Sequence, residues 1–195
     1  MAAIVVPFSG ASGKQRLKPL PAEARAELAL AMLADVLAAC KHVGPTRVVT
    51  ADERGEVVAM DHEAEIVEDP GEGQASAVAA ALRDVEGRVL VVNADLPCVV
   101  PRDLRTLEAA TPDEGLAYVA ARDGTTNALG LSSPSLFAPL YGAESAERFR
   151  LHAQSLGVSA MPATIPNLAD DVDSLDDLSR LKLRVGPRTL AAQPR

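Results

Sequence analysis

The chain has 195 residues, of which 48% are hydrophobic, and its formal net charge is −8. This length suits one globular domain with a substantial core, and the negative charge disfavours nucleic acid as a partner because a phosphate backbone would be repelled. Aromatic residues make up 3% of the chain and Trp is absent, which also disfavours a stacking surface for single strands. No apolar run reaches membrane-spanning length and no signal peptide is visible, so we expect a cytoplasmic protein without a membrane partner.

A basic, glycine-containing loop follows the first predicted strand, residues 4–8. Gly13 would let the backbone approach a phosphate, while Lys14 and Arg16 would supply counter-charge. The pattern is not a P-loop, because Gln15 stands where Ser or Thr belongs. A solvated basic turn is the alternative interpretation. The position directly after the first strand favours binding of a nucleotide phosphate.

The next segments predict a long helix, two strands and a second polar loop. Apolar residues at helical spacing between residues 32 and 40 predict a helix that ends near Gly44. Strands are expected at 47–50 and 64–67, with a short helical turn at 57–60 between them. The loop 68–74 contains Asp69, Gly73 and Gln74 and precedes an Ala-rich helix, 75–83. A carboxylate, a glycine backbone and an amide can bind the edge of a purine base, although ordinary turn chemistry also explains this loop.

Asp95 follows the most apolar predicted strand, residues 88–92, and Pro97 restrains the loop after it. Open α/β sheets bind their ligands at the carboxyl ends of central strands, so this carboxylate is a candidate ligand-binding group. Asp is also common in turns, and this stretch alone does not separate the two interpretations.

The second half of the chain predicts a helix from residue 101, strands at 116–121 and 128–131, a short helix at 134–140, a helix at 145–156 and a last strand at 160–165. Gly142 and Ser145 precede or begin the 145–156 helix. They are explained equally by helix capping or by an anion site at the helix N-terminus.

A late acidic cluster follows the last predicted strand. Ser174 and Asp177 have the spacing of a capping box, with Asp in place of Glu. Asp171 and Asp173 are not explained by capping; their alternation puts both carboxylates on one side of the backbone, where they repel each other unless a cation or water separates them. Residues 186–195 contain little apolar material, so we predict a domain at 1–185 and a disordered tail at 186–195.

Strands alternate with helices along the chain, which predicts an α/β fold: one Rossmann-like domain whose mostly parallel sheet has helices on both faces. In such a sheet the basic loop, Asp95 and the late acidic pair can converge at one edge. Oxygen-rich carboxylates without His or Cys suit Mg²⁺. A metal that bridges phosphates, together with Lys14 and Arg16, would provide the charge neutralisation that nucleotidyl transfer needs.

The sequence resembles the 2-phospho-L-lactate or phosphoenolpyruvate guanylyltransferases of coenzyme F420 biosynthesis. That family has a nucleotidyltransferase fold related to the molybdenum cofactor guanylyltransferases. The resemblance extends to about Leu183 and depends on six segments in order: GKQRL (13–17), DPGEGQ (69–74), NADLP (93–97), GTTNAL (124–129), YGAES (141–145) and DVDS (171–174).

The resemblance implies transfer of GMP from GTP to the phosphate of phosphoenolpyruvate or 2-phospho-L-lactate, with release of pyrophosphate. It implies that Asp95 and the Asp171/Asp173 pair hold Mg²⁺, and it leaves open which of the pair is the ligand. Lys14 and Arg16, near Gly13, would contact the GTP phosphates. The loop with Asp69, Gly73 and Gln74 would lie near guanine.

The resemblance also implies that Thr126, Gly142 and Ser145 bind the acceptor, with Thr125 as an alternative to Thr126. The sequence departs from the family pattern at Gln15, at Glu72 and at Ser174. Glu72 could tighten or block the base loop.

Two other functions stay open at this point: a nucleotidyltransferase acting on a molybdopterin or sugar phosphate, and a nucleotide-binding regulatory module without catalysis. The sequence does not indicate an oligomeric state.

Overall fold

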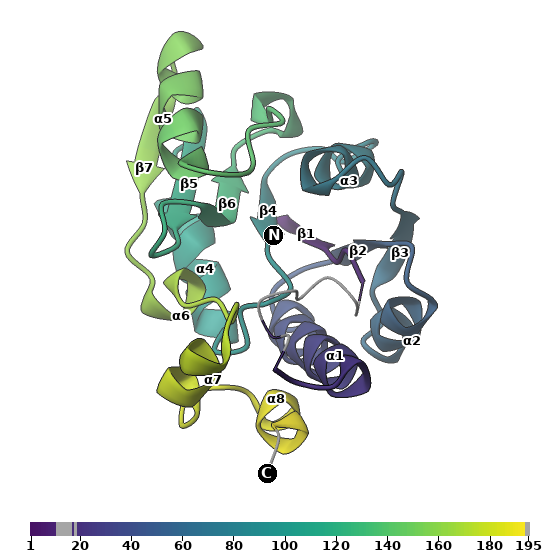
Figure 1. Ribbon diagram of the computed structural model, residues 1–195. Helices are drawn as coiled ribbons and strands as arrows, with labels where there is room; N and C mark the ends of the chain where they lie inside the picture. Colours follow the sequence, from purple (N-terminus) through teal and green to yellow (C-terminus); the bar gives the residue numbers. More distant parts are fainter. Residues whose placement is uncertain (11–16, 18, 194–195) are drawn as a thin grey trace.

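The computed structural model describes residues 1–10, 17 and 19–193, and its centre is a seven-stranded sheet between layers of helices (Figure 1). The strands lie in the order β3-β2-β1-β4-β6-β5-β7. β6 runs antiparallel to both its neighbours, and the other neighbouring pairs are parallel. The predicted mostly parallel sheet is therefore confirmed. The strand bounds are β1 Ala3–Pro7, β2 Thr46–Thr50, β3 Glu65–Glu68, β4 Val89–Val92, β5 Gly115–Ala120, β6 Thr126–Leu131 and β7 Ser159–Pro162.

The central strands are apolar on both faces because helices cover both. In β1, Ile4 and Val6 pack into the core on one face, while Val5 packs into the core on the other. This alternation follows from the two-residue period of a strand. A strand covered on both faces needs a continuous apolar run, which is the pattern found in β1 and β4.

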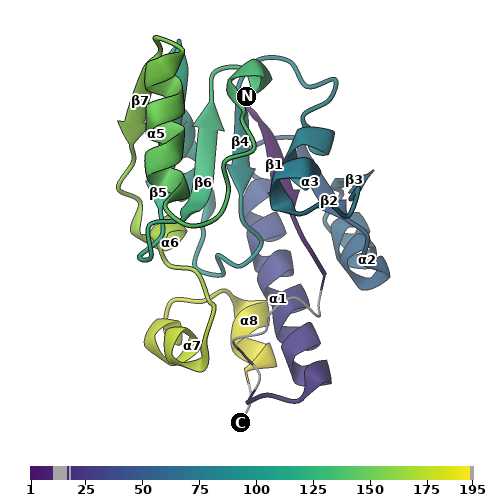
Figure 2. The ribbon, with the colours of Figure 1, turned by 45° about the horizontal axis from the view of Figure 1, so that its top comes forward.

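Helices lie on both faces of the sheet, as the views in Figures 1 and 2 show. One face is covered by α1 (Ala22–Cys40), α2 (Glu53–Asp61), α4 (Pro101–Ala110) and α6 (Pro166–Ala169). The other is covered by α3 (Gln74–Ala81) and α5 (Ser145–Ser155), with the 3-10 turn η2 (Pro134–Leu136) beside them. Among the described residues, no helix is both long and apolar enough to cross a membrane.

Three local expectations need correction. In place of the short helix expected at 134–140, the structure has the 3-10 turn Pro134–Leu136. The expected helical turn at 57–60 is the longer helix α2, because the Asp52 side chain accepts hydrogen bonds from the N–H groups of Arg54 and Gly55 and so begins the helix earlier. The last strand, expected at 160–165, ends at Pro162, and Pro166 begins α6. The predicted capping box of Ser174 and Asp177 is confirmed at the start of α7 (Leu175–Leu181).

We expected a disordered tail at 186–195, but most of the described part of this segment is helical. Residues Pro187–Ala192 form helix α8, which lies beside α1 (Figure 2). Asp35 of α1 accepts hydrogen bonds from the N–H groups of Arg188 and Thr189, at 3.2 and 2.8 Å, and Thr189 is fully buried. The helix is therefore begun by a carboxylate from a distant part of the chain, which local composition cannot reveal.

The connections change direction between β1 and β4. From β1 the chain proceeds to β2 and β3 on one side, and from β4 it proceeds to the strands on the other. β1 and β4 are neighbours in the sheet, so the change of direction lies between two adjacent parallel strands. Such a point is where open α/β sheets bind ligands.

Candidate metal and nucleotide site

A cleft of about 410 Å³ lies at the carboxyl ends of β1 and β4. This volume is within the range of small-molecule sites. The cleft is lined by the segment after β1, by the α1 side chains beneath it, by the loop and first turns of α3, and by the loop after β4: Pro7, Phe8, Ser9, Gly10, Ala29, Met32, Asp69, Gly73, Gln74, Ala77, Asn93, Ala94, Asp95 and Asp173. The predicted base loop and two of the predicted acidic residues, Asp95 and Asp173, therefore share one cleft.

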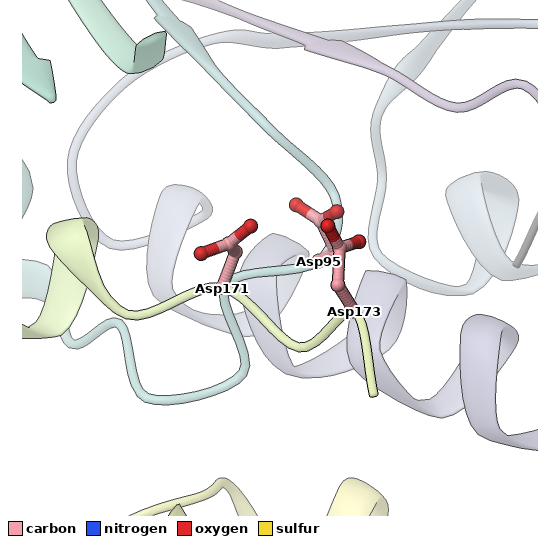
Figure 3. Close-up of side chains that lie close together, drawn as sticks. All are labelled: Asp95, Asp171 and Asp173. Atoms are coloured by element: carbon pink, nitrogen blue, oxygen red, sulfur yellow. The ribbon is translucent and has the colours of Figure 1, made fainter. Parts of the chain in front are cut away.

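Asp95, Asp171 and Asp173 come together at this cleft (Figure 3). Each offers a carboxylate oxygen, and these three oxygens lie within 4.8 Å of one another. Asp95 comes from the loop after β4, and the other two come from the segment between α6 and α7. All three side chains are half-buried.

The backbone explains how the two segments meet. The N–H group of Val172 donates a hydrogen bond to the carbonyl oxygen of Asp95, at 3.1 Å. The Val172 side chain is fully buried beside Leu28 in a third apolar cluster beneath the site. Because Val172 is fixed from both directions, the residues on either side of it present their carboxylates to Asp95. The alternation seen in the sequence thus brings Asp171 and Asp173 to one place, although this segment joins no strand.

The electrostatics of the triad favour a bound cation. Burial, followed by the charges of Asp95 and Asp173, raises the pKa of Asp171 to about 6, and the adjacent Asn127 amide opposes that rise. Asn127 itself is 2% exposed. Like charges this close are stable together when a positive charge lies between them. A cluster of carboxylate oxygens without nitrogen or sulfur donors fits a hard divalent cation such as Mg²⁺.

The loop before α3 also lines the cleft, through Asp69 and Gly73. Gly73 precedes α3 with φ +92°, a conformation that favours glycine. Asp69 accepts a hydrogen bond from the N–H group of Gly71 at 2.9 Å, and Gln74 Nε2 donates to Asn93 Oδ1 at 2.7 Å. Glu72 does not line the cleft that the described residues form; its carboxylate accepts from Ser76 Oγ at 3.3 Å.

The three residues expected at the acceptor form a separate group near the start of α5. Ser145 Oγ donates to Thr126 Oγ1 at 3.1 Å, and both residues are buried. Gly142 adopts φ +109°, and its carbonyl accepts from the N–H group of Ser145 at 3.1 Å. Thr125 instead binds Asp123 within the turn. None of Thr126, Gly142 and Ser145 lines the 410 Å³ cleft.

Two backbone N–H groups at the start of α5 have backbone acceptors. Its first N–H group, at Ser145, is taken by Gly142, and its second, at Ala146, donates to the carbonyl of Gly124 at 3.3 Å. These bonds fasten the 124–126 turn to α5, so the hydroxyl pair of Thr126 and Ser145 is held in place by backbone contacts.

Comparison with known proteins identifies the family. The family model described as "Guanylyl transferase CofC like" matches residues 2–185. The chain belongs to this family. A phosphoenolpyruvate guanylyltransferase of Conexibacter woesei is 36% identical, over 93% of this chain and 86% of its own length. Another protein of that name, from Rhodococcus erythropolis, is 35% identical over 100% of this chain and 96% of its own.

Solved structures agree with the family assignment in fold. A putative nucleotide-diphospho-sugar transferase of Desulfovibrio desulfuricans has a TM-score of 0.76 at 15% identity, covering 98% of this chain and 94% of that one. Glucosyl-3-phosphoglycerate synthase of Mycobacterium tuberculosis, solved with Mn²⁺ and uridine diphosphate, has a TM-score of 0.62 at 14% identity, covering 85% and 70%. The resemblance drawn from six sequence segments and the predicted Rossmann-like nucleotidyltransferase fold are both confirmed.

In this member of the guanylyltransferase family, the predicted base loop and acidic residues lie together, while the predicted acceptor residues form a separate group. Gly13, Lys14 and Arg16 lie outside the described residues; of their described neighbours, Gly10 lines the cleft and Leu17 packs into the third apolar cluster.

Sequence reasoning did not single out Asn93, which lines the cleft. Its Oδ1 accepts from Gln74, and its Nδ2 donates to the carbonyl of Thr126 at 3.3 Å. It therefore connects the base loop to the strand that carries Thr126. The available signal was its place at the start of the NADLP segment, two residues before Asp95.

Proposed function

We propose that this protein transfers GMP from GTP to the phosphate of phosphoenolpyruvate and releases pyrophosphate, as a step of coenzyme F420 biosynthesis. The observation that carries the proposal is the triad of Asp95, Asp171 and Asp173, two of which line the cleft of about 410 Å³. Phosphoenolpyruvate is preferred to 2-phospho-L-lactate as acceptor because relatives at 33–36% identity have the name phosphoenolpyruvate guanylyltransferase.

In this proposal Asp95 and the Asp171/Asp173 pair hold Mg²⁺. The cation would neutralise phosphate charge as the leaving pyrophosphate develops. The chain's own part is to present three carboxylates at a fixed separation, which the backbone bond from Val172 to Asp95 supports. The donor set is all oxygen, and this supports Mg²⁺ or Mn²⁺ over zinc.

The reaction requires no nucleophilic side chain. A phosphate oxygen of phosphoenolpyruvate forms a bond to the α-phosphorus of GTP, and the bond from that phosphorus to the β-phosphate bridging oxygen breaks. Lys14 and Arg16 are proposed to contact the GTP phosphates and to stabilise the charge of the leaving group.

The nucleotide and the acceptor are proposed to contact different loops. Asp69, Gly73 and Gln74 are proposed to contact guanine, because they line the same cleft as Asp95 and Asp173. Thr126, Gly142 and Ser145 are proposed to bind the acceptor.

The test is a direct assay. The purified protein is incubated with GTP, Mg²⁺ and either phosphoenolpyruvate or 2-phospho-L-lactate, and the product is identified by mass spectrometry alongside pyrophosphate release. We expect a guanylylated phosphoenolpyruvate, no turnover in EDTA, and near-complete loss of activity in Asp95→Asn. Asp61→Asn, an exposed acid at the end of α2, is the matched control. No product with either acid would contradict the proposal. Turnover only with a sugar phosphate or a molybdopterin would indicate a nucleotidyltransferase with that acceptor. GTP binding without turnover would indicate a regulatory module.

A further inference from the structure

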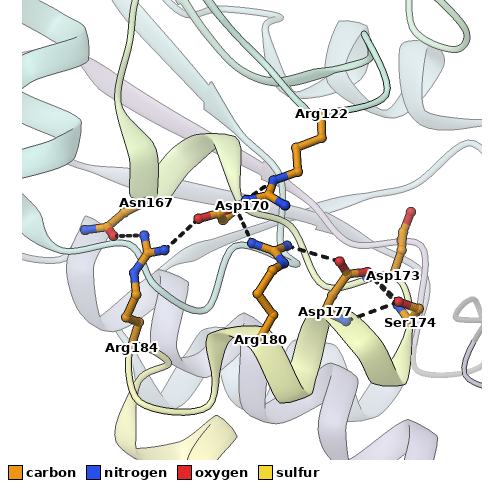
Figure 4. Close-up of polar contacts among 8 residues, drawn as sticks. All are labelled: Arg122, Asn167, Asp170, Asp173, Ser174, Asp177, Arg180 and Arg184. Atoms are coloured by element: carbon orange, nitrogen blue, oxygen red, sulfur yellow. Dashed lines mark hydrogen bonds and ion pairs between the residues drawn. The ribbon is translucent and has the colours of Figure 1, made fainter.

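The segment that carries Asp171 and Asp173 is fastened at every second residue. Asp170, Val172 and Ser174 are each held by the protein, and the two acidic residues of the triad lie between them. Val172 is fixed by its backbone bond to Asp95 and by burial of its side chain. The contacts of Asp170 and Ser174 are charged and polar (Figure 4).

Asp170 is the first of these anchors. Its side chain is 7% exposed and forms ion pairs with three arginines. Arg180 and Arg184, from α7 and the turn after it, approach to 2.6 and 2.7 Å, and Arg122, from the turn after β5, approaches to 3.3 Å. The buried carboxylate therefore joins the acidic segment to α7 and to the turn that leads into Thr126.

Ser174 and Asp177 form the other anchor. One carboxylate oxygen of Asp177 accepts from Ser174 N at 3.0 Å, from Ser174 Oγ at 2.7 Å and from Asp173 N at 3.3 Å. The other oxygen accepts from Arg180 Nη2 at 3.0 Å. The backbone of one member of the triad, Asp173, is thus held directly by the same carboxylate that pairs with Arg180.

Arg180 contacts both anchors through the two arms of its guanidinium. One arm donates to Asp170 and the other to Asp177, so a single planar, forked group spans the segment that contains Asp171 and Asp173. Arg184 shares Asp170 but its second arm donates to Asn167, away from Asp177. Figure 4 shows Arg180 between the two carboxylates.

We propose that Arg180 is a positioning residue of the metal site: it holds the 170–174 segment at both ends and so fixes the separation of Asp171 and Asp173 from Asp95. The inference rests on the proposed function, because it takes the triad as the metal site. Three carboxylates repel one another before the cation arrives, and Arg180 joins the two anchors that oppose this repulsion on either side of Val172. Residues that orient metal ligands through hydrogen bonds typically contribute 10–100-fold to metal affinity.

The experiment measures Mn²⁺ affinity at pH 7.5 by electron paramagnetic resonance of the free ion, without substrates or turnover. Arg180→Gln is expected to weaken Mn²⁺ binding about 10-fold or more. Arg180→Lys is expected to lose less, because an ammonium group reaches one carboxylate at a time. Arg184→Gln is also expected to lose less, since Arg184 contacts only one anchor.

Arg47→Gln is the matched control for a purely structural effect. Arg47 also bridges separate elements, donating to Glu65 Oε2 at 2.9 Å and to the carbonyl of Ala81 at 3.0 Å, and it belongs to β2 rather than to the C-terminal segment. This variant is expected to lower the melting temperature and to leave Mn²⁺ affinity unchanged.

The outcomes separate this inference from the function it rests on. Folded Arg180→Gln with Mn²⁺ affinity within twofold of the parent, or a loss no larger than that of Arg47→Gln, overturns the positioning role alone. If Arg180→Gln does not fold, Arg180→Lys decides: it is expected to lose more Mn²⁺ affinity than Arg47→Gln, and a loss no larger than that of Arg47→Gln overturns the positioning role. A parent protein that binds no Mn²⁺ overturns the proposed metal site and the role of Arg180 together.

Discussion

Replacing Asp171 by Asn should stabilise the metal-free protein while removing its response to metal. The pKa of this carboxyl is raised from 3.8 to about 6, first by burial and then by the charges of Asp95 and Asp173. Because the pKa is higher in the folded state than in the unfolded state, the contribution of Asp171 to stability is full below about pH 4 and is lost as the pH rises through 6. At pH 7.5 the ionised carboxylate therefore opposes folding, and the neutral amide of Asn does not.

The magnitude follows from the size of the shift. A difference of about 2 pKa units corresponds to about 3 kcal/mol, and solvent screening of this half-buried group reduces the contribution to about 1 kcal/mol. For a chain of this size, such a change raises the melting temperature by about 2–4 °C. The increase should be present at pH 7.5 and should largely disappear at pH 4.5, where the parent carboxyl is protonated.

The assay is thermal unfolding in EDTA at both pH values, repeated at pH 7.5 with saturating Mg²⁺. The parent should gain stability from Mg²⁺ at pH 7.5 and Asp171→Asn should gain little, because one carboxylate of the triad is gone. Asp61→Asn should match the parent in every condition. A melting temperature of Asp171→Asn that equals the parent's at pH 7.5, or a difference that does not change with pH, would refute the electrostatic argument.

Three further predictions concern other parts of the molecule. Ser145→Ala removes the hydrogen bond to Thr126 and should raise the KM for phosphoenolpyruvate by about 5–10-fold, with the KM for GTP unchanged. Thr125→Ala should change neither KM, because the Thr125 hydroxyl binds within its own turn. Equal effects of the two variants in steady-state kinetics would contradict these roles. Gln74→Met should weaken GTP binding by about 5–10-fold in calorimetry, because it removes an amide held at the cleft wall; unchanged affinity would exclude Gln74 from base recognition. Asp35→Ala leaves two N–H groups at the start of α8 without their acceptor. It should lower the free energy of unfolding, measured by urea denaturation, by about 2 kcal/mol. An unchanged urea midpoint would show that α8 does not depend on this cap.

The parts of the structure that local sequence patterns encode were predictable. The buried run of β4 and the Asp95 that follows it have a strand-end signature, and the alternation of Asp171 and Asp173 indicates a shared direction. The boundary of α2 was also available, because Asp52 is a favourable N-cap residue, but the apolar pattern alone suggested a shorter element.

The remaining features depend on contacts between distant segments. The cap of α8 comes from Asp35, which is 154 positions away from Thr189. The pairing of Gln74 with Asn93 joins two loops that meet only when β1 and β4 lie side by side. Arg180 and Arg184 have the four-residue spacing of ordinary helix surface residues. Their role becomes visible only in the structure, where both pair with the buried carboxylate of Asp170. The sequence does not show which of its many polar residues pair across such distances, so these contacts could not be predicted locally.

The backbone bond between Val172 and Asp95 has a consequence for the order in which the molecule is assembled. Synthesis delivers the strand that carries Asp95 well before the segment that carries the other two acids, so a nascent or truncated chain that stops before residue 170 has one carboxylate of the triad. In the folded chain this segment packs in the third apolar cluster with residues of α1 and α7, and α8 lies against α1. In the proposed metal site the ligands therefore come from two distant segments, and a chain truncated before residue 170 is expected not to bind the cation.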